Sequence, residues 1–313
     1  MRLAQWITWS LRIRRVEYRV AELPIFFIPV FLSISRTGEL REYTLWEGLV
    51  AFLFMMAFGD LLNCLADRDL DAAYKPHLTE AVYGLGIRGV IVQAVLSGIG
   101  ATLLCAHLAW ALDRWILLPA ALIGLFVAYA YSVEPFRLKG RGLWQLAFYW
   151  AGLFTGPMVF AALLVRPWPP LGTLSAAIAY GMMQTGVILV NTAEDYPEDR
   201  AMGVNTVVVA LGLPRSIAVS LRLTLVGGLL LTATMLAIGW LRSTPPLRLA
   251  GILPLVLSFL AVATAIARLE RRLRGATEPA QIQAVKEAAR WVPLGITAPA
   301  VTSLIASIAL SPL

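Results

Sequence analysis

The chain has 313 residues, of which 59% are hydrophobic and 14% are charged. Soluble domains contain roughly 45–50% apolar residues, so this composition excludes a water-soluble globule and predicts an all-α membrane protein. The net charge of +7 is expected to serve membrane topology and lipid headgroups, and no nucleic-acid partner is expected.

The first segment, residues 1–20, intersperses Trp6, Trp9 and Leu11 with several arginines. A cleavable signal peptide would have an uninterrupted apolar core instead. We therefore expect an amphipathic N-terminal helix that lies on the membrane surface.

Nine apolar segments, separated by loop residues, are predicted to be transmembrane helices. They comprise residues 22–35, 45–64, 86–110, 115–132, 143–165, 173–193, 214–241, 246–268 and 291–310. Residues 1–313 are expected to form a single membrane domain. If the N-terminus is cytoplasmic, 20 of the 26 Lys and Arg residues fall on the cytoplasmic side, as the positive-inside rule favours. We therefore expect an integral multi-pass protein whose N-terminus and acidic motifs are cytoplasmic.

The first acidic motif lies at the cytoplasmic end of the second predicted span. Asn63, Asp67 and Asp71 follow one another at four-residue intervals. Residues four apart in a helix differ by about 40° in direction. The three side chains are therefore expected to line one face.

The same spacing recurs 128 residues later, at the cytoplasmic end of the sixth predicted span, as Asn191, Asp195 and Asp199. Pro197 disfavours helix at Tyr196. Asp199 is therefore expected on a bend or in a new first turn.

Clustered carboxylates near a membrane need a compensating cation or access to water. Mg²⁺ takes oxygen ligands, commonly one or two carboxylates with water and substrate phosphates. The two motifs therefore suit a metal-bridged diphosphate. The simpler interpretation is that these are solvated aspartates at helix ends, but the repetition with matching asparagines at one membrane face argues against it.

A basic segment, Tyr131–Arg141, lies between the fourth and fifth predicted spans. Arg137 and Lys139 could bind the phosphate oxygens of a leaving group, although a basic loop is also an ordinary topology signal. Tyr131 could stabilise a carbocation through its aromatic face or anchor the helix end at the interface.

At these residues the chain resembles the UbiA superfamily of intramembrane prenyltransferases, and the resemblance spans most of its length. The run from Asp195 to Gly212 is the most specific part. The resemblance implies nine transmembrane helices around a central cavity with a cytoplasmic cap. It also implies Mg²⁺ as cofactor, a prenyl diphosphate and a lipophilic acceptor as partners, and no obligate protein partner.

The resemblance assigns roles to individual residues. Asp67, Asp71, Asp195 and Asp199 would be the catalytic residues that hold Mg²⁺. Substrate binding would involve Asn63, Asn191 and Lys139, together with Tyr131 and Arg137 of the basic segment. Cys64 departs from the family pattern, because many relatives have an aspartate there and a thiol is a poor Mg²⁺ ligand.

The expected function is Mg²⁺-dependent transfer of a prenyl group to an aromatic or other lipophilic acceptor. A first alternative is a terpene cyclase of the same superfamily, which would ionise the prenyl diphosphate without an acceptor. A second is a transporter with ion-coupling carboxylates, but no second half of the chain repeats the first.

Overall fold

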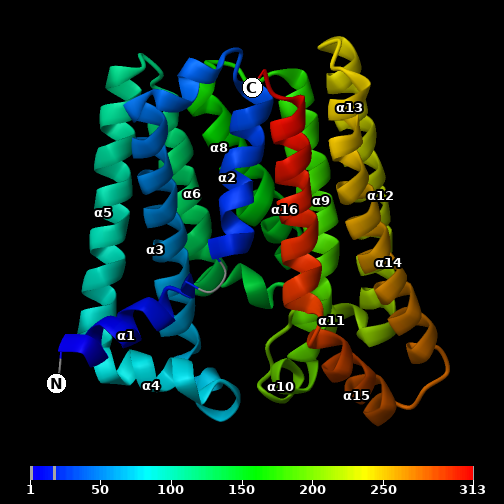
Figure 1. The fold of residues 1–313 in the computed structure, drawn as a ribbon. Helices are drawn as coiled ribbons and strands as arrows, with labels where there is room; N and C mark the ends of the chain where they lie inside the picture. The colour runs from blue at the N-terminus through cyan, green and yellow to red at the C-terminus, as the bar shows by residue number, and fades with distance from the viewer. Residues whose placement is uncertain (1–2, 17–18, 313) are drawn as a thin grey trace. The chain divides into compact units, whose positions relative to one another are not determined.

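The structure is a computed structural model that describes residues 3–16 and 19–312. Within these ranges the regular elements are helices, apart from one isolated bridge between Arg141 and Asn205 (Figure 1). The described chain is therefore all-α, as predicted. It divides into two compact units, Met1–Val20 with Arg41–Leu138 and Ala21–Leu40 with Lys139–Leu313.

The first unit is built on three long helices that run side by side, with two short helices packed together near one end (Figure 1). The long helices are α3 (Tyr43–Tyr74), α5 (Ile87–Ala111) and α6 (Leu117–Ser132), and the short ones are α1 (Leu3–Ile13) and α4 (Pro76–Leu85). The ring of Trp9 lies so close to Gly84 that a Cβ there would be 2.5 Å away. A glycine therefore allows α1 to pack on α4.

Helix α1 has two different faces. Ser10 and Ile13 are buried, whereas Leu3, Ile7 and Leu11 are exposed at four-residue intervals. The structure therefore shows a helix at Leu3–Ile13, whereas the amphipathic segment over residues 1–20 stays a prediction. Its position on a membrane surface remains a prediction.

The second unit contains the remaining helices. They are α2 (Arg19–Ser33, which begins in the first unit), α7 (Trp144–Ala147), the π-helix η4 (Phe148–Thr155), α8 (Gly156–Val165), α9 (Leu171–Glu194), α10 (Tyr196–Ala201), α11 (Val207–Leu211), α12 (Leu213–Leu241), α13 (Pro246–Leu249), α14 (Leu253–Leu273), α15 (Glu278–Ala289) and α16 (Val292–Leu310). Short 3₁₀ turns lie at Thr37–Arg41 (η2), Leu138–Gly140 (η3, at the boundary between the units) and Ala250–Ile252 (η5).

Helix α9 packs closely against α12 in this unit. A Cβ at Gly227 of α12 would clash with the backbone nitrogen of Met183 and lie 2.8 Å from the carbonyl oxygen of Ala179. Small residues allow helix backbones to approach in this way inside membranes. The position of α9, which leads into the second acidic motif, therefore depends on a glycine of α12.

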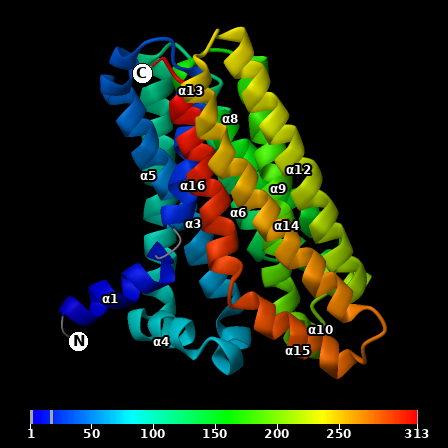
Figure 2. The same cartoon turned by 45° about the vertical axis from the view of Figure 1, so that its right-hand side comes forward.

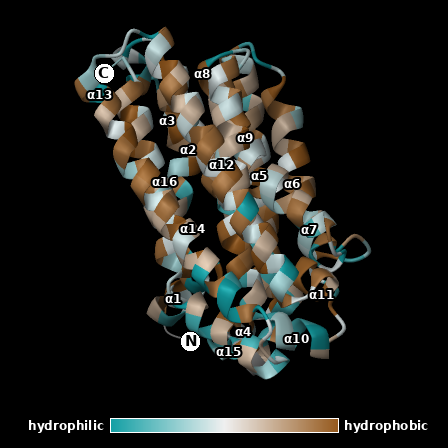
Figure 3. Ribbon diagram, turned by 90° about the vertical axis from the view of Figure 1, so that its right-hand side faces the viewer, coloured by the Kyte–Doolittle hydropathy of each residue, from teal (hydrophilic) through white to brown (hydrophobic). Residues whose placement is uncertain are grey.

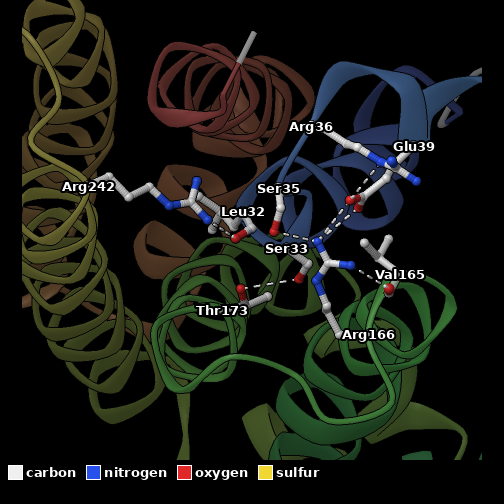
Figure 4. Close-up of polar contacts among 9 residues, drawn as sticks. All are labelled: Leu32, Ser33, Ser35, Arg36, Glu39, Val165, Arg166, Thr173 and Arg242. Carbon is white, nitrogen blue, oxygen red and sulfur yellow. Dashed lines mark hydrogen bonds and ion pairs between the residues drawn. The ribbon is translucent and has the colours of Figure 1, made fainter.

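A polar cluster holds together the end of the second unit where α2, α8, α12 and α16 terminate (Figure 4). Arg166 donates to Ser35 at 2.6 Å and pairs with Glu39 at 3.0 Å. Arg242 donates to the carbonyl oxygens of Leu32 at 2.5 Å and Leu310 at 3.0 Å. Because the last carbonyls of a helix lack intrahelical partners, Arg242 caps α2 and α16 together.

Seven helical segments in the described part of the chain are long and apolar enough to cross a membrane, and hydrophobic residues dominate their length (Figure 3). Each overlaps a predicted span; they are Tyr43–Ala72, Ile87–Ala111, Trp144–Val165, Leu171–Glu194, Leu213–Leu241, Pro246–Leu273 and Val292–Leu310. The other two predicted spans correspond to α2 and α6, which have 15 and 16 residues. Since a crossing needs roughly 20 residues, the number nine remains a prediction.

Candidate functional site

The first acidic motif lies within the continuous helix α3. The side-chain amide of Asn63 donates to Oδ2 of Asp67 at 2.9 Å, which confirms that these two residues share a face. Asp67 and Asp71 are only 8% and 6% exposed. Burying a carboxylate is costly unless it gains hydrogen bonds or a cation, so this face of α3 suits a cation site.

The loop after α6 brings a cation to this motif. Nη2 of Arg137 lies 3.9 Å from Oδ1 of Asp67. The hydroxyl of Ser132, the last residue of α6, lies 3.5 Å from Nδ2 of Asn63. Arg137 has a φ of 36°, a left-handed conformation that is unfavourable for residues other than glycine. Tyr131 lies beside Ser132 in the last turn of α6 and is partly exposed.

Two neighbours of the motif lie elsewhere on α3. The carboxylate of Asp69 is 70% exposed and accepts a hydrogen bond from the Tyr83 hydroxyl at 3.0 Å. Cys64 is 1% exposed, and its Sγ lies 3.6 Å from the carbonyl oxygen of Ile13. Cys64 therefore contacts the end of α1, which explains why an apolar thiol fits this position.

The second motif is broken at the predicted place. Helix α9 ends at Glu194, Asp195 lies between helices, and α10 begins at Tyr196 with Pro197 in its first turn. The backbone N–H of Asp199 donates to the carbonyl oxygen of Asp195 at 2.8 Å. Asp199 is therefore in a new first turn, as predicted, and is 7% exposed. Asn191 lies one turn before Asp195 on α9 and is exposed.

The residues that follow Asp199 shape the loop. Gly203 and Gly212 have φ values of 69° and 76°, which glycine adopts without strain. The Thr206 hydroxyl caps α11 by accepting from the N–H of Val209 at 3.4 Å. The N–H of Val204 donates to the carbonyl oxygen of Asp199 at 2.8 Å. The most specific part of the sequence resemblance therefore consists of residues that fold this loop.

The basic segment continues into the second unit beside this loop. Arg141 bridges to Asn205, and the N–H of Gly142 donates to the carbonyl oxygen of Asn205 at 2.7 Å. Lys139, in η3, is 7% exposed. A lysine that is buried to this extent is normally paired with an acidic or polar group.

Sequence reasoning missed a polar chain behind the second motif. Gln145 Oε1 accepts from the N–H of Val207 at 2.9 Å, and its Nε2 donates to the Tyr149 hydroxyl at 3.0 Å. That hydroxyl lies 3.1 Å from Oγ1 of Thr192, the residue after Asn191. The sequence feature that could have indicated it is Gln145, a polar residue within a predicted apolar span. The chain of hydrogen bonds links α7, the π-helix, α9 and α11.

No group of three or more His, Cys, Asp or Glu side chains among the described residues is placed to hold a metal ion. Each unit does supply two motif aspartates, and of these Asp67, Asp71 and Asp199 are buried. Mg²⁺ commonly takes one or two protein carboxylates and completes its shell with water and phosphate. The donor chemistry therefore fits Mg²⁺ together with a phosphorylated ligand.

A sequence model described as the UbiA prenyltransferase family matches residues 23–282. The bacteriochlorophyll synthase 33 kDa chain of Cereibacter sphaeroides is 33% identical over 180 residues, which cover 56% of this chain and 57% of that protein. The corresponding protein of Rhodobacter capsulatus is 28% identical over 203 residues, covering 60% and 64%. The chloroplastic chlorophyll synthase of Oryza sativa is 27% identical over 177 residues, covering 51% and 43%. The matches therefore span less than two thirds of each relative.

Solved structures share the fold over nearly the whole chain. A UbiA homolog from Archaeoglobus fulgidus, bound to DMAPP and Mg²⁺, has a TM-score of 0.62 at 17% identity, covering 93% of this chain and 99% of that one. A digeranylgeranylglyceryl phosphate synthase has a TM-score of 0.65 at 14% identity, covering 97% and 99%. At these identities the likeness is evidence for the fold alone.

Proposed function

The chain belongs to the UbiA prenyltransferase family, and we propose that it is an intramembrane, Mg²⁺-dependent prenyltransferase. It would ionise a prenyl diphosphate and transfer the prenyl group to an aromatic or other lipophilic acceptor. The observation that carries the proposal is the pair of buried aspartates on α3, Asp67 and Asp71, of which Asp67 accepts a hydrogen bond from Asn63. The same spacing recurs at Asn191, Asp195 and Asp199.

We assign the metal to Asp67, Asp71, Asp195 and Asp199. Bound Mg²⁺ would supply stabilisation of the negative charge that develops on the departing diphosphate. Asn63 holds the Asp67 carboxylate through its hydrogen bond, and Asn191 would serve the second motif from the corresponding position. No step of the proposal requires Cys64, whose thiol contacts the end of α1.

Basic side chains would bind the diphosphate, and the apolar helices would protect the carbocation from water. Arg137 and Lys139 would bind the diphosphate oxygens, since guanidinium and ammonium groups both donate to phosphate. The allylic C–O bond breaks as diphosphate leaves, a carbon or another nucleophilic group of the acceptor attacks the allylic cation, and the acceptor loses a proton. Tyr131 could stabilise that cation through its aromatic face, and surrounding apolar helices would exclude water.

The proposal extends to topology. Residues 1–313 would form one membrane domain with nine spans around a central cavity, a cytoplasmic cap and a cytoplasmic N-terminus. The asymmetric distribution of Lys and Arg supports this orientation. Attaching a membrane-impermeant thiol label to single cysteines placed at each end of α9, in a variant lacking Cys64 and Cys105, would test it.

The names of the relatives suggest the first substrates to test. The Archaeoglobus fulgidus homolog was bound to DMAPP, so DMAPP should be among the donors. Three sequence relatives are named bacteriochlorophyll or chlorophyll synthases, so a pigment precursor related to chlorophyll should be among the acceptors.

Purified protein in detergent or lipid would be incubated with Mg²⁺ and a panel of prenyl diphosphates, with and without acceptors. Diphosphate release and organic products would be recorded, and EDTA should abolish both. A prenylated product that depends on the acceptor supports transfer. A cyclic terpene formed without acceptor would replace transfer by cyclisation, and no Mg²⁺-dependent release with any donor would reject the proposal.

A further inference from the structure

Helix α15 (Glu278–Ala289), which connects α14 to α16, lies against α10, the short helix that carries Asp199 (Figure 2). Helix α10 has only six residues. It is not a continuation of α9, because α9 ends before Asp195 and Pro197 lies in the first turn of α10. Such a short helix is unstable in isolation. Its conformation must therefore come from contacts with the rest of the second unit.

A polar triangle joins α10 to the start of α15. The Tyr196 hydroxyl donates to Oε1 of Glu278 at 3.0 Å, and Nη1 of Arg200 donates to the Tyr196 oxygen at 3.0 Å. Arg200 also forms an ion pair with Glu278. The Arg200 guanidinium is charged at every physiological pH, because arginine is not deprotonated in proteins. The triangle therefore combines hydrogen bonds that are strengthened by charge.

Two further contacts join the helices. Nζ of Lys286 lies 3.4 Å from Oε1 of Glu198, whose side chain is only 15% exposed. The ring of Tyr196 belongs to an apolar cluster that includes Val285 and Ala288 of α15. The residues that make these contacts, at positions 196, 198 and 200, are each next to Asp195 or Asp199 in the sequence.

We propose that α15 is a brace that holds α10 in the conformation in which Asp195 and Asp199 bind the metal, with Glu278 as a positioning residue. The inference rests on the proposed function, because that function assigns both aspartates to Mg²⁺. Groups that orient metal ligands from outside the coordination shell strongly affect metal affinity. Glu278 acts on the aspartates through Tyr196 and Arg200 without itself being a ligand.

The test compares the full chain with Glu278→Ala in detergent. Hydrogen exchange would be measured at the amides of Asp199 and Val204, which donate to Asp195 and Asp199. Mn²⁺ binding in the presence of DMAPP would be measured by electron paramagnetic resonance. We expect exchange to accelerate and the Kd for Mn²⁺ to rise by about tenfold. Glu287→Ala is the matched control, because Glu287 lies on the same helix and contacts Arg272 and Gln283 instead of α10.

A charge exchange gives an independent test. Glu198→Lys should weaken Mn²⁺ binding by repelling Lys286, and adding Lys286→Glu should restore it. Unchanged exchange in Glu278→Ala would overturn the brace. Faster exchange with unchanged Mn²⁺ affinity would overturn the positioning role. Failure of the wild-type chain to bind Mn²⁺ would reject the metal site itself, and the exchange data would still show whether α15 holds α10.

Discussion

Nδ2 of Asn63 lies 2.9 Å from Oδ2 of Asp67, one turn further along α3. The amide can donate to one carboxylate oxygen while Arg137 lies 3.9 Å from the other. A buried carboxylate held in this way has a defined orientation toward a cation. The arrangement makes Asn63 a specific target for mutation.

Replacing Asn63 with Leu removes the donor and keeps a similar side-chain volume. We expect the Mg²⁺ concentration for half-maximal diphosphate release to rise by about tenfold, because metal affinity falls when a residue that hydrogen-bonds to a metal ligand is removed. Asp69→Asn is the control, because the exposed carboxylate of Asp69 is outside the four-residue spacing of Asn63 and Asp67. Equal Mg²⁺ dependence in Asn63→Leu and wild type would contradict the role assigned to Asn63.

Replacing Asp67 or Asp199 with Ala removes a buried charge and, in our proposal, a metal ligand. We expect the rate of diphosphate release to fall by about 100-fold or more. Mutation of a residue that only hydrogen-bonds to a metal ligand already lowers metal affinity or activity by about 10–100-fold. Membrane insertion should persist, because both residues lie near helix ends. Wild-type turnover in both variants, measured on protein of equal yield and monodispersity, would reject the metal assignment.

Lys139 offers a test of diphosphate binding. Lys139→Met should raise KM for the prenyl diphosphate by about tenfold, because a hydrogen bond to a charged group contributes about 1.5–3 kcal/mol. Lys139→Arg should recover part of this loss by keeping the charge. The measurement is steady-state release at saturating Mg²⁺. An unchanged KM in Lys139→Met would remove Lys139 from the substrate site.

Gly227→Ala tests the close approach of α12 to α9. The new methyl group would meet the backbone of Met183 and Ala179, which cannot move without displacing α9. We expect a destabilisation of about 1–3 kcal/mol, seen as a lower unfolding temperature in detergent, together with reduced activity. Gly89→Ala is the control, since a Cβ there meets open space. Equal stability of the two variants would contradict the packing argument.

Much of the acidic site was predictable because it depends on local geometry. The four-residue spacing of Asn63 and Asp67 implies a shared helix face, and their hydrogen bond confirms it. Pro197 cannot continue the helix, and α9 ends before it. The glycine and threonine positions after Asp199 entered only through the family resemblance, and the structure shows the positive φ values and the helix cap that they provide.

Other features depend on contacts between distant segments, which no local pattern encodes. The pairing of Tyr196 with Glu278 joins residues 82 positions apart, and Gln145 reaches Val207 across 62. The position of Cys64 against Ile13 likewise required the folded chain.

The sequence by itself determined the helical class, most of the apolar spans and the positions of the two acidic motifs, because composition and periodicity act over one or two turns. Only the tertiary structure decided which side chains are buried, how Arg137 reaches Asp67 and how α15 contacts α10. Those outcomes follow from side-chain packing between helices, which depends on shape complementarity over the whole unit.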